Sequence, residues 1–188
     1  PKNGIVLDTS TGYGGRLVGF FASGLLKYVG IDPNTETHTA NLKMAADLGF
    51  SKKVVLHNIP AEDASAEKIG PCDFAFTSPP YFSKEHYSEQ DTQSWKRYPS
   101  GASWRDGFLV PMLRLQYACL RNGCRSVINI QDVVIGKDKY PLVEWTKDAA
   151  KKVGFKHENT EQYALSKFIG ANLEERVAFE PVLIFRKG

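Results

Sequence analysis

Short apolar runs of strand length alternate with segments of helical periodicity along most of the chain. The runs predict strands at residues 5–7, 28–31, 53–57, 73–77 and 126–130. The segments between and after them predict helices at residues 17–28, 34–48, 104–120 and 140–153. Because strands and helices alternate, the pattern predicts βαβ units around a mainly parallel sheet.

The last part of the chain departs from this alternation. Two strand-like runs, near residues 155–163 and 177–185, follow each other with no helix of comparable length between them. Consecutive strands without a crossover helix pair antiparallel. We therefore expect an antiparallel hairpin to close the sheet at its C-terminal end.

The composition narrows the class of protein. The chain has 188 residues, of which 42% are hydrophobic and 24% charged, with a formal net charge of +3. These values predict one α/β domain, residues 1–188, and exclude collagen-like, coiled-coil and disordered chains. The small positive charge permits an anionic partner without requiring one.

Cysteine usage and hydropathy set the expected compartment. The three cysteines lack metal-ligand spacing, and no apolar run reaches transmembrane length. We expect a cytoplasmic protein in a reducing compartment, with no metal site and no membrane partner. The oligomeric state stays open. Because the first predicted strand begins at Ile5 with no preceding Met, we also expect a trimmed domain that lacks an N-terminal segment.

A glycine-rich turn follows the first predicted strand, between Asp8 and Gly15. Glycines let a backbone turn sharply and approach a ligand closely. A dinucleotide-binding fingerprint would need another glycine at Leu17, so that interpretation fails. The carboxylate of Asp8 would repel a pyrophosphate but could pair with an ammonium group, and Asp32, after the second strand, could hold a ribose diol. An ammonium, a ribose and no pyrophosphate describe S-adenosylmethionine.

The sharpest motif is Ser78-Pro79-Pro80-Tyr81, directly after the fourth predicted strand. The two prolines fix the backbone and remove donors, which predicts a rigid turn with a carbonyl free to accept. The Ser78 hydroxyl and a proline carbonyl could accept two hydrogen bonds from an exocyclic amino group, and Tyr81 could stack on the ring that bears it. This arrangement predicts methylation of an aromatic amine by positioning and electrostatics.

These two motifs resemble those of class I S-adenosylmethionine-dependent methyltransferases, and the Ser-Pro-Pro-Tyr turn resembles that of DNA amino-methyltransferases. The closing segment, residues 179–186, resembles that of prophage-type DNA methylases. The resemblance implies a Rossmann-like α/β fold and a single catalytic domain. Most stand-alone DNA methyltransferases also carry a target-recognition domain, and this sequence departs from them because none of its segments is long enough for one. It implies a restriction-modification type of DNA methylation, with Ser78, Pro79, Pro80 and Tyr81 as catalytic residues. It also implies that the cofactor is bound by Asp8, Thr9, Ser10, Gly12, Gly14, Asp32, Ala61 and Glu62.

Residues 82–103 form the longest segment with no predicted element, and they interleave aromatic and basic side chains. Such a segment suits stacking on bases and pairing with phosphates. We predict that Phe82, Lys96 and Arg97 bind a DNA substrate. The alternative is a lid that packs its own aromatic residues, with acidic residues cancelling its charge.

Several alternatives remain open at this stage. In the family that the motif resembles, Ser at position 78 is typical of cytosine N4 enzymes, and adenine N6 is the second candidate. An RNA or protein-amide methyltransferase and a non-catalytic cofactor- or DNA-binding module are the other rivals. A cytosine C5 mechanism would need a thiolate nucleophile. Cys72 precedes the fourth strand instead of following it, so we expect a small core residue there.

Overall fold

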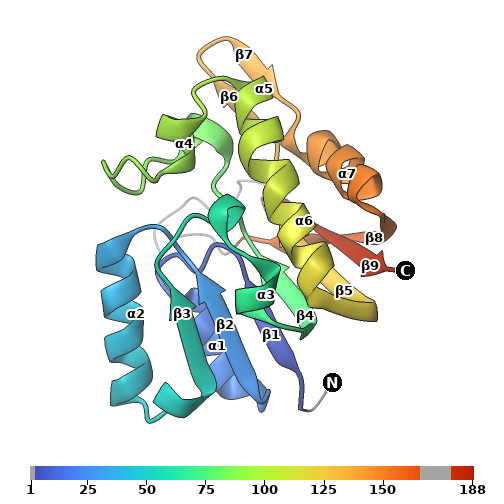
Figure 1. Cartoon of the computed structure of the whole chain (residues 1–188). Helices are drawn as coiled ribbons and strands as arrows, with labels where there is room; N and C mark the ends of the chain where they lie inside the picture. The colour runs from blue at the N-terminus through green and yellow to red at the C-terminus, as the bar shows by residue number, and fades with distance from the viewer. Residues whose placement is uncertain (1–2, 166–178) are drawn as a thin grey trace, which may run out of the picture.

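The computed structural model describes residues 3–165 and 179–188. They form a seven-stranded sheet in the order β3-β2-β1-β4-β5-β9-β8, together with a separate β6-β7 hairpin (Figure 1). The strands are β1 (Ile5–Asp8), β2 (Lys27–Ile31), β3 (Val54–His57), β4 (Cys72–Thr77), β5 (Leu120–Asn129), β6 (Val133–Ile135), β7 (Asp138–Tyr140), β8 (Phe155–Ala164) and β9 (Phe179–Lys187).

The pairing confirms both predictions about the sheet. Strands β3, β2, β1, β4 and β5 pair in parallel, whereas β9 pairs antiparallel with both β5 and β8. Because parallel strands end at the same edge, the segments that follow β1, β2, β3 and β4 meet there. This edge collects the polar motifs of the sequence.

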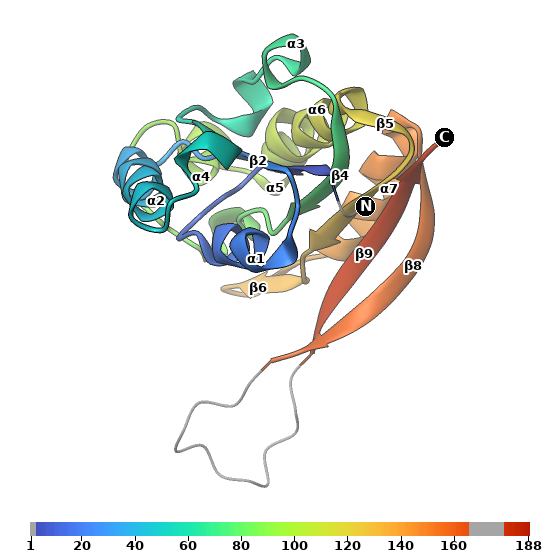
Figure 2. The same cartoon turned by 90° about the horizontal axis from the view of Figure 1, so that it is seen from below.

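Helices cover both faces of the sheet. The longer ones are α1 (Gly15–Ser23), α2 (Thr35–Asp47), α6 (Val110–Cys119) and α7 (Leu142–Val153). The shorter ones are η1 (Ser51–Lys53), η2 (Ala61–Asp63), α3 (Ala66–Ile69), η3 (Phe82–Lys84), α4 (Ser94–Arg97), α5 (Gly101–Trp104) and η4 (Arg105–Leu109). Leu17 of α1 packs with Val6 on one face, and the helices α6 and α7 pack with Leu7 on the other (Figure 2).

Some predicted boundaries were wrong. The first helix ends at Ser23 rather than at residue 28, because Gly24 adopts a left-handed conformation and the next residues enter β2. Residue Tyr140 belongs to β7, a hairpin strand that the helical periodicity concealed. The segment 82–103 contains short helices, and it runs into a helical stretch that continues through the π-helical turn η4 to Cys119.

The described residues carry no feature of a membrane span or a metal centre. Within 3–165 and 179–188, no helix is both long and apolar enough to cross a bilayer. The same ranges hold no cluster of His, Cys, Asp and Glu that could bind a metal ion. Cys72 is completely buried at the start of β4, and burial raises the pKa of its thiol to about 12. It is therefore a core residue, as predicted.

Candidate active site

A cavity opens at the carboxyl edge of the sheet, where β1, β2 and β4 end. Its wall comes from the glycine-rich turn, the N-terminal part of α2, η2, the turn after β4 and the segment that follows. The lining residues predicted from the sequence are Thr9, Ser10, Gly12, Asp32, Ala61, Glu62, Ser78 and Pro80. The structure thus brings together side chains that lie up to 71 positions apart, from Thr9 to Pro80.

The glycine-rich turn is shaped by two glycines with positive φ, Gly12 at 55° and Gly14 at 84°. Gly14 does not line the cavity. It lies against α2, where a Cβ atom would come within 2.3 Å of Asn41 Oδ1. The Asn41 amide in turn donates to the Gly12 carbonyl at 2.8 Å. Gly14 therefore shapes the turn and lets α2 pack closely, rather than contacting a cofactor.

This packing gives a stability prediction. We expect Gly14→Ala to lower the free energy of unfolding by about 2 kcal/mol or more, because a left-handed residue with a Cβ costs about 1–2 kcal/mol before the clash is counted. Gly19 is the matched control, since it lies on an open face of α1 with no atom within 4 Å of its ideal Cβ. Gly19→Ala should stabilise by about 0.5–1 kcal/mol. Urea unfolding measures both, and equal effects would contradict this role of Gly14.

Asp32 lines the cavity, and its carboxylate has hydrogen-bond acceptor sites that the described residues do not occupy. Its Oδ2 accepts the Gly12 N–H at 2.7 Å, and its Oδ1 accepts the Asn34 N–H at 2.9 Å. Burial raises the pKa of Asp32, and the two backbone hydrogen bonds oppose that rise. A carboxylate has about four acceptor sites, so about two remain for a diol. The predicted ribose-binding role fits this geometry.

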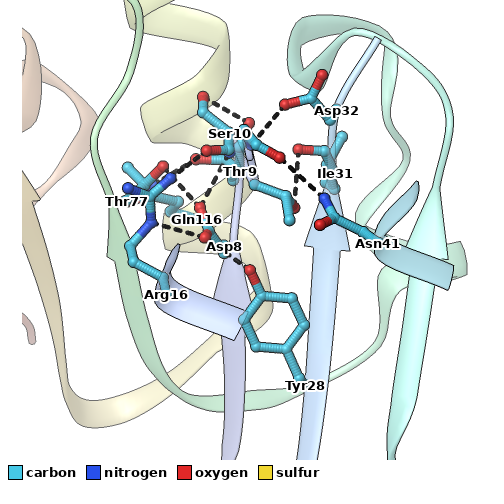
Figure 3. A network of polar contacts seen from close by, with 12 residues as sticks. Asp8, Thr9, Ser10, Arg16, Tyr28, Ile31, Asp32, Asn41, Thr77 and Gln116 are labelled. Carbon is cyan, nitrogen blue, oxygen red and sulfur yellow. Dashed lines mark hydrogen bonds and ion pairs between the residues drawn. The ribbon is translucent and has the colours of Figure 1, made fainter. Parts of the chain in front are cut away.

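Asp8 is in a different position. It is completely buried and does not line the cavity. Its Oδ1 accepts from Ser10 N–H at 3.1 Å and Thr77 Oγ1 at 3.0 Å, and its Oδ2 accepts from Arg16 Nε and Tyr28 Oη, both at 2.7 Å (Figure 3). These four donors use about all its acceptor sites. The structure therefore corrects the expectation that Asp8 pairs with an ammonium group.

Two partners of Asp8 have raised pKa values: Arg16 stays charged and Tyr28 stays neutral. Burial acts to lower the pKa of Arg16, but the charge and hydrogen bond of Asp8 outweigh it and raise that pKa. Burial and the Asp8 charge raise the pKa of Tyr28 well above its ordinary value, so its phenol donates. An ion pair thus joins Arg16, which lines the cavity, to Asp8, which is buried behind it.

A second buried chain of hydrogen bonds holds Thr9 from across the sheet. Ser126 Oγ donates to Gln116 Oε1 at 2.6 Å, and Gln116 Nε2 donates to Thr9 Oγ1 at 2.8 Å. All three side chains are at most 1% exposed. Thr9, a predicted cofactor residue that lines the cavity, is therefore fixed by α6 and β5. Sequence reasoning missed Gln116 because it lies 107 positions from its partner.

At the end of β3, Glu62 lines the cavity and is paired with Arg97. Arg97 Nη1 donates to Glu62 Oε1 at 2.7 Å, and the guanidinium also pairs with both oxygens of Asp63, at 2.9 and 3.0 Å. Burial raises the pKa of Glu62, and the Arg97 charge opposes this. Arg97 was predicted to bind substrate. It instead anchors the segment 82–103 to η2.

The turn after β4 presents Ser78 and Pro80 to the cavity, whereas Pro79 and Tyr81 lie outside its lining. Phe82 N–H donates to the Pro80 carbonyl at 2.9 Å, and among the described residues the Pro79 carbonyl has no donor. Burial raises the pKa of Tyr81 to about 12, while the adjacent Ser78 hydroxyl acts to lower it. The Ser78 hydroxyl and the Pro79 carbonyl are thus the candidate acceptors at the turn.

Tyr81 is held from behind. Its phenol accepts a hydrogen bond from Asn129 Nδ2 at 3.0 Å, and Asn129 also donates to Glu180 Oε2 at 2.8 Å. The Tyr81 side chain is 7% exposed and packs in the main core. Its tethered ring therefore sits in the core rather than on the cavity wall, and stacking on a substrate ring stays a prediction.

Phe82 and Lys96 of the segment 82–103 favour the lid interpretation over the predicted substrate contacts. Phe82 is 2% exposed and packs on Trp104 and Tyr140, so it is a core residue rather than a substrate contact. Lys96 pairs with Glu89 at 3.3 Å and with Asp91 at 3.6 Å. The lid interpretation holds for these side chains, because their aromatic and basic groups are used within the chain.

The structure adds lining residues that the sequence analysis missed. They are Thr11, Tyr13, Gly15, Arg16, Pro33, Asn34, Thr37, Pro60, Tyr87, Thr92, Gln93, Ser94 and Phe108. Most belong to the same segments as the predicted residues. The signal that could have found Tyr13 is its position in the glycine-rich turn, where a large aromatic side chain is left 76% exposed.

The strand order and the cavity at the carboxyl edge define a class I methyltransferase fold. No family model and no curated protein matches the chain. Several solved structures, however, do match its fold. A putative S-adenosylmethionine-dependent methyltransferase from Listeria monocytogenes matches with a TM-score of 0.66 at 11% identity, over 100% of this chain and 92% of that one.

TrmN from Thermus thermophilus also matches, with a TM-score of 0.66 at 15% identity over 98% of this chain. The match covers 44% of TrmN, so this chain spans less than half of that protein. The cyclase SpnF matches with a TM-score of 0.66 at 12% identity, over 98% of this chain and 75% of SpnF. Because a cyclase shares the fold, the fold alone does not specify the reaction, and the site must carry the argument.

Proposed function

We propose that this chain is an S-adenosylmethionine-dependent methyltransferase that acts on an exocyclic amino group of a DNA base, with cytosine N4 as the first candidate. The observation that carries the proposal is the shared cavity. It is lined both by Asp32, which has free acceptor sites, and by Ser78 of the Ser-Pro-Pro-Tyr turn.

The cavity residues fit S-adenosylmethionine. Asp32 would hold the ribose diol through its remaining acceptor sites, and Ala61 and Glu62 would lie beside the adenine. The backbone of the glycine-rich turn, from Thr9 to Gly12, would follow the amino-acid end. When bound, the cofactor supplies an electrophilic methyl group.

The turn after β4 supplies the groups that bind the amine. The Ser78 hydroxyl and the Pro79 carbonyl can each accept one N–H of an exocyclic amino group. The prolines fix the backbone that carries both acceptors, and Phe82, with φ of 54°, completes the turn. Two fixed acceptors orient the nitrogen lone pair toward the cavity and withdraw it from the aromatic ring, which makes the nitrogen nucleophilic.

Two aromatic side chains stand where the substrate would enter. Tyr13 from the glycine-rich turn and Tyr87 from the segment after η3 both line the cavity, with ring centroids 5.9 Å apart. They are 76% and 44% exposed. Exposed rings at the mouth of a cavity suit stacking on a nucleobase. A base in a duplex would have to be flipped out to reach Ser78, which favours single-stranded DNA as the better substrate of this chain.

We expect Tyr87→Ala to raise the KM for DNA about tenfold, because base–aromatic stacking contributes about 1–3 kcal/mol per base. The affinity for the cofactor and kcat should change less than about twofold, since Tyr87 lies at the mouth and not at the turn. Tyr163, an exposed tyrosine on β8 that does not line the cavity, is the control. Steady-state kinetics on a single-stranded oligonucleotide measure this, and an unchanged KM would contradict the stacking role.

Mass spectrometry of nucleosides, and of the intact peptide, tests the proposal itself. Unmethylated single- and double-stranded DNA, RNA of the same sequence and a glutamine peptide would each be incubated with the protein and S-adenosylmethionine. N4-methylcytosine in DNA is the expected product. N6-methyladenine would keep the amine mechanism and change the base, whereas modification of RNA or peptide alone would overturn the DNA assignment. Cofactor binding without any methylated product would favour a non-catalytic module.

A further inference from the structure

The part of the cavity next to the glycine-rich turn, where the amino-acid end of the cofactor would lie, is lined by a positive and not by a negative side chain. The sequence, with Asp8 in this turn, suggests the opposite charge. Asp8 is buried behind the wall with about all of its acceptor sites occupied, whereas Arg16 lines the cavity. Arg16 is therefore the charged residue that lines this end of the cavity. Resting on the proposed function, we infer that Arg16 binds the α-carboxylate of the cofactor's amino-acid end.

The position of Arg16 supports this. With the ribose at Asp32 and the methyl group directed toward Ser78, the amino-acid end is left to the part of the cavity formed by Ser10, Gly15 and Arg16. In the described part of the chain, no other basic side chain lines the cavity. A carboxylate in this region thus has one cationic partner.

The donor count of Arg16 leaves room for a ligand. A guanidinium carries five N–H donors. The Nε–H donates to Asp8 Oδ2 at 2.7 Å, and Nη2 donates to the Ser10 carbonyl (Figure 3). The remaining three have no acceptor among residues 3–165 and 179–188. Two of them, on neighbouring nitrogens, can donate to both oxygens of a carboxylate, which is the preferred geometry of an arginine–carboxylate pair.

Asp8 then acts as a positioning residue. Its ion pair fixes the guanidinium, and Tyr28 and Thr77 fix the carboxylate of Asp8 in turn. The Arg16 side chain is 23% exposed, so its charge is partly withdrawn from water and acts strongly on a nearby anion. The consequence is selectivity: nucleosides that carry the whole amino acid should bind better than those without the carboxylate.

The test compares S-adenosylhomocysteine with its decarboxylated analogue, which keeps the amine, thioether and adenosine. Isothermal titration calorimetry should show that the native chain binds S-adenosylhomocysteine at least about tenfold more tightly. Arg16→Gln should weaken S-adenosylhomocysteine about 10- to 100-fold and change the analogue less than about twofold, which removes the preference. Arg16→Lys, which keeps the charge without the fork, should be intermediate.

A structural role alone would give a different result. If Arg16→Gln weakens both ligands equally, or neither, the inference is overturned. Because Arg16→Gln leaves Asp8 buried without its cation, the double variant Asp8→Asn, Arg16→Gln is measured beside it, and it should also lose the preference. A native chain that binds both ligands equally would overturn this inference alone. A native chain that binds neither ligand would overturn the proposed function as well.

Discussion

Ser78→Ala should lower kcat for methyl transfer by about 100-fold or more, with the cofactor Kd changed less than about twofold. Removing one fixed hydrogen-bonding group at a reacting centre typically costs about 100- to 1,000-fold in turnover. Ser78 lies at the end of β4, and its hydroxyl and the Pro79 carbonyl are the candidate acceptors for the amino group. The variant removes only an oxygen atom, and the proline-fixed turn remains.

Ser83→Ala is the matched control for this variant. Ser83 lies five residues further along in η3, outside the cavity lining, and its hydroxyl has no hydrogen-bond partner among the described residues. The change should leave kcat and the cofactor Kd as they are. Single-turnover kinetics and equilibrium binding separate the two quantities. A Ser78→Ala variant that turns over normally, or that loses cofactor binding instead of turnover, would remove the amine-binding role from this hydroxyl.

The elements of the sheet follow from local pattern because their strands are short apolar runs between polar turns. The errors lie where a local rule was overridden. Gly24 ends α1 five residues before the predicted limit, since its left-handed conformation stops the helix while apolar residues continue into β2. Tyr140 fits a helical period, but pairing with Val133 places it in a hairpin.

In the site, too, the features that depend on nearby residues could be predicted from the sequence, and those that depend on distant contacts could not. Asp32, Ser78 and the glycine-rich turn lie at the ends of predicted strands, so strand order alone brings them to one edge. The state of Asp8 depends on Thr77, 69 positions away. No spacing rule predicts from the sequence that this contact and the Arg16 ion pair will help to occupy the acceptor sites of the Asp8 carboxylate. A charged residue in a motif can therefore hold the lining residues in place without contacting the ligand itself.

The contrast between the two aspartates makes Asp32→Ala the most informative binding variant. We expect it to weaken S-adenosylhomocysteine by about 100-fold or more, because hydrogen bonds to a charged group contribute about 1.5–3 kcal/mol each and two are lost with the ribose diol. The Gly12 and Asn34 N–H groups also lose their acceptor, which loosens the turn and the start of α2. Other hydrogen bonds still hold the turn, since the Asn41 amide donates to the Gly12 carbonyl and the Thr11 N–H donates to the Ile31 carbonyl.

Asp47→Ala controls for the lost charge, since this exposed carboxylate at the end of α2 pairs, among the residues that the structure describes, only with Lys43 and does not line the cavity. It should leave cofactor affinity unchanged. Calorimetry at neutral pH measures both variants. Because burial raises the pKa of Asp32, acidification should protonate it at a higher pH than an ordinary aspartate and weaken cofactor binding in the native chain. That acid dependence should be reduced in Asp32→Ala, and an identical dependence in both chains would assign the ribose contact to a group other than Asp32.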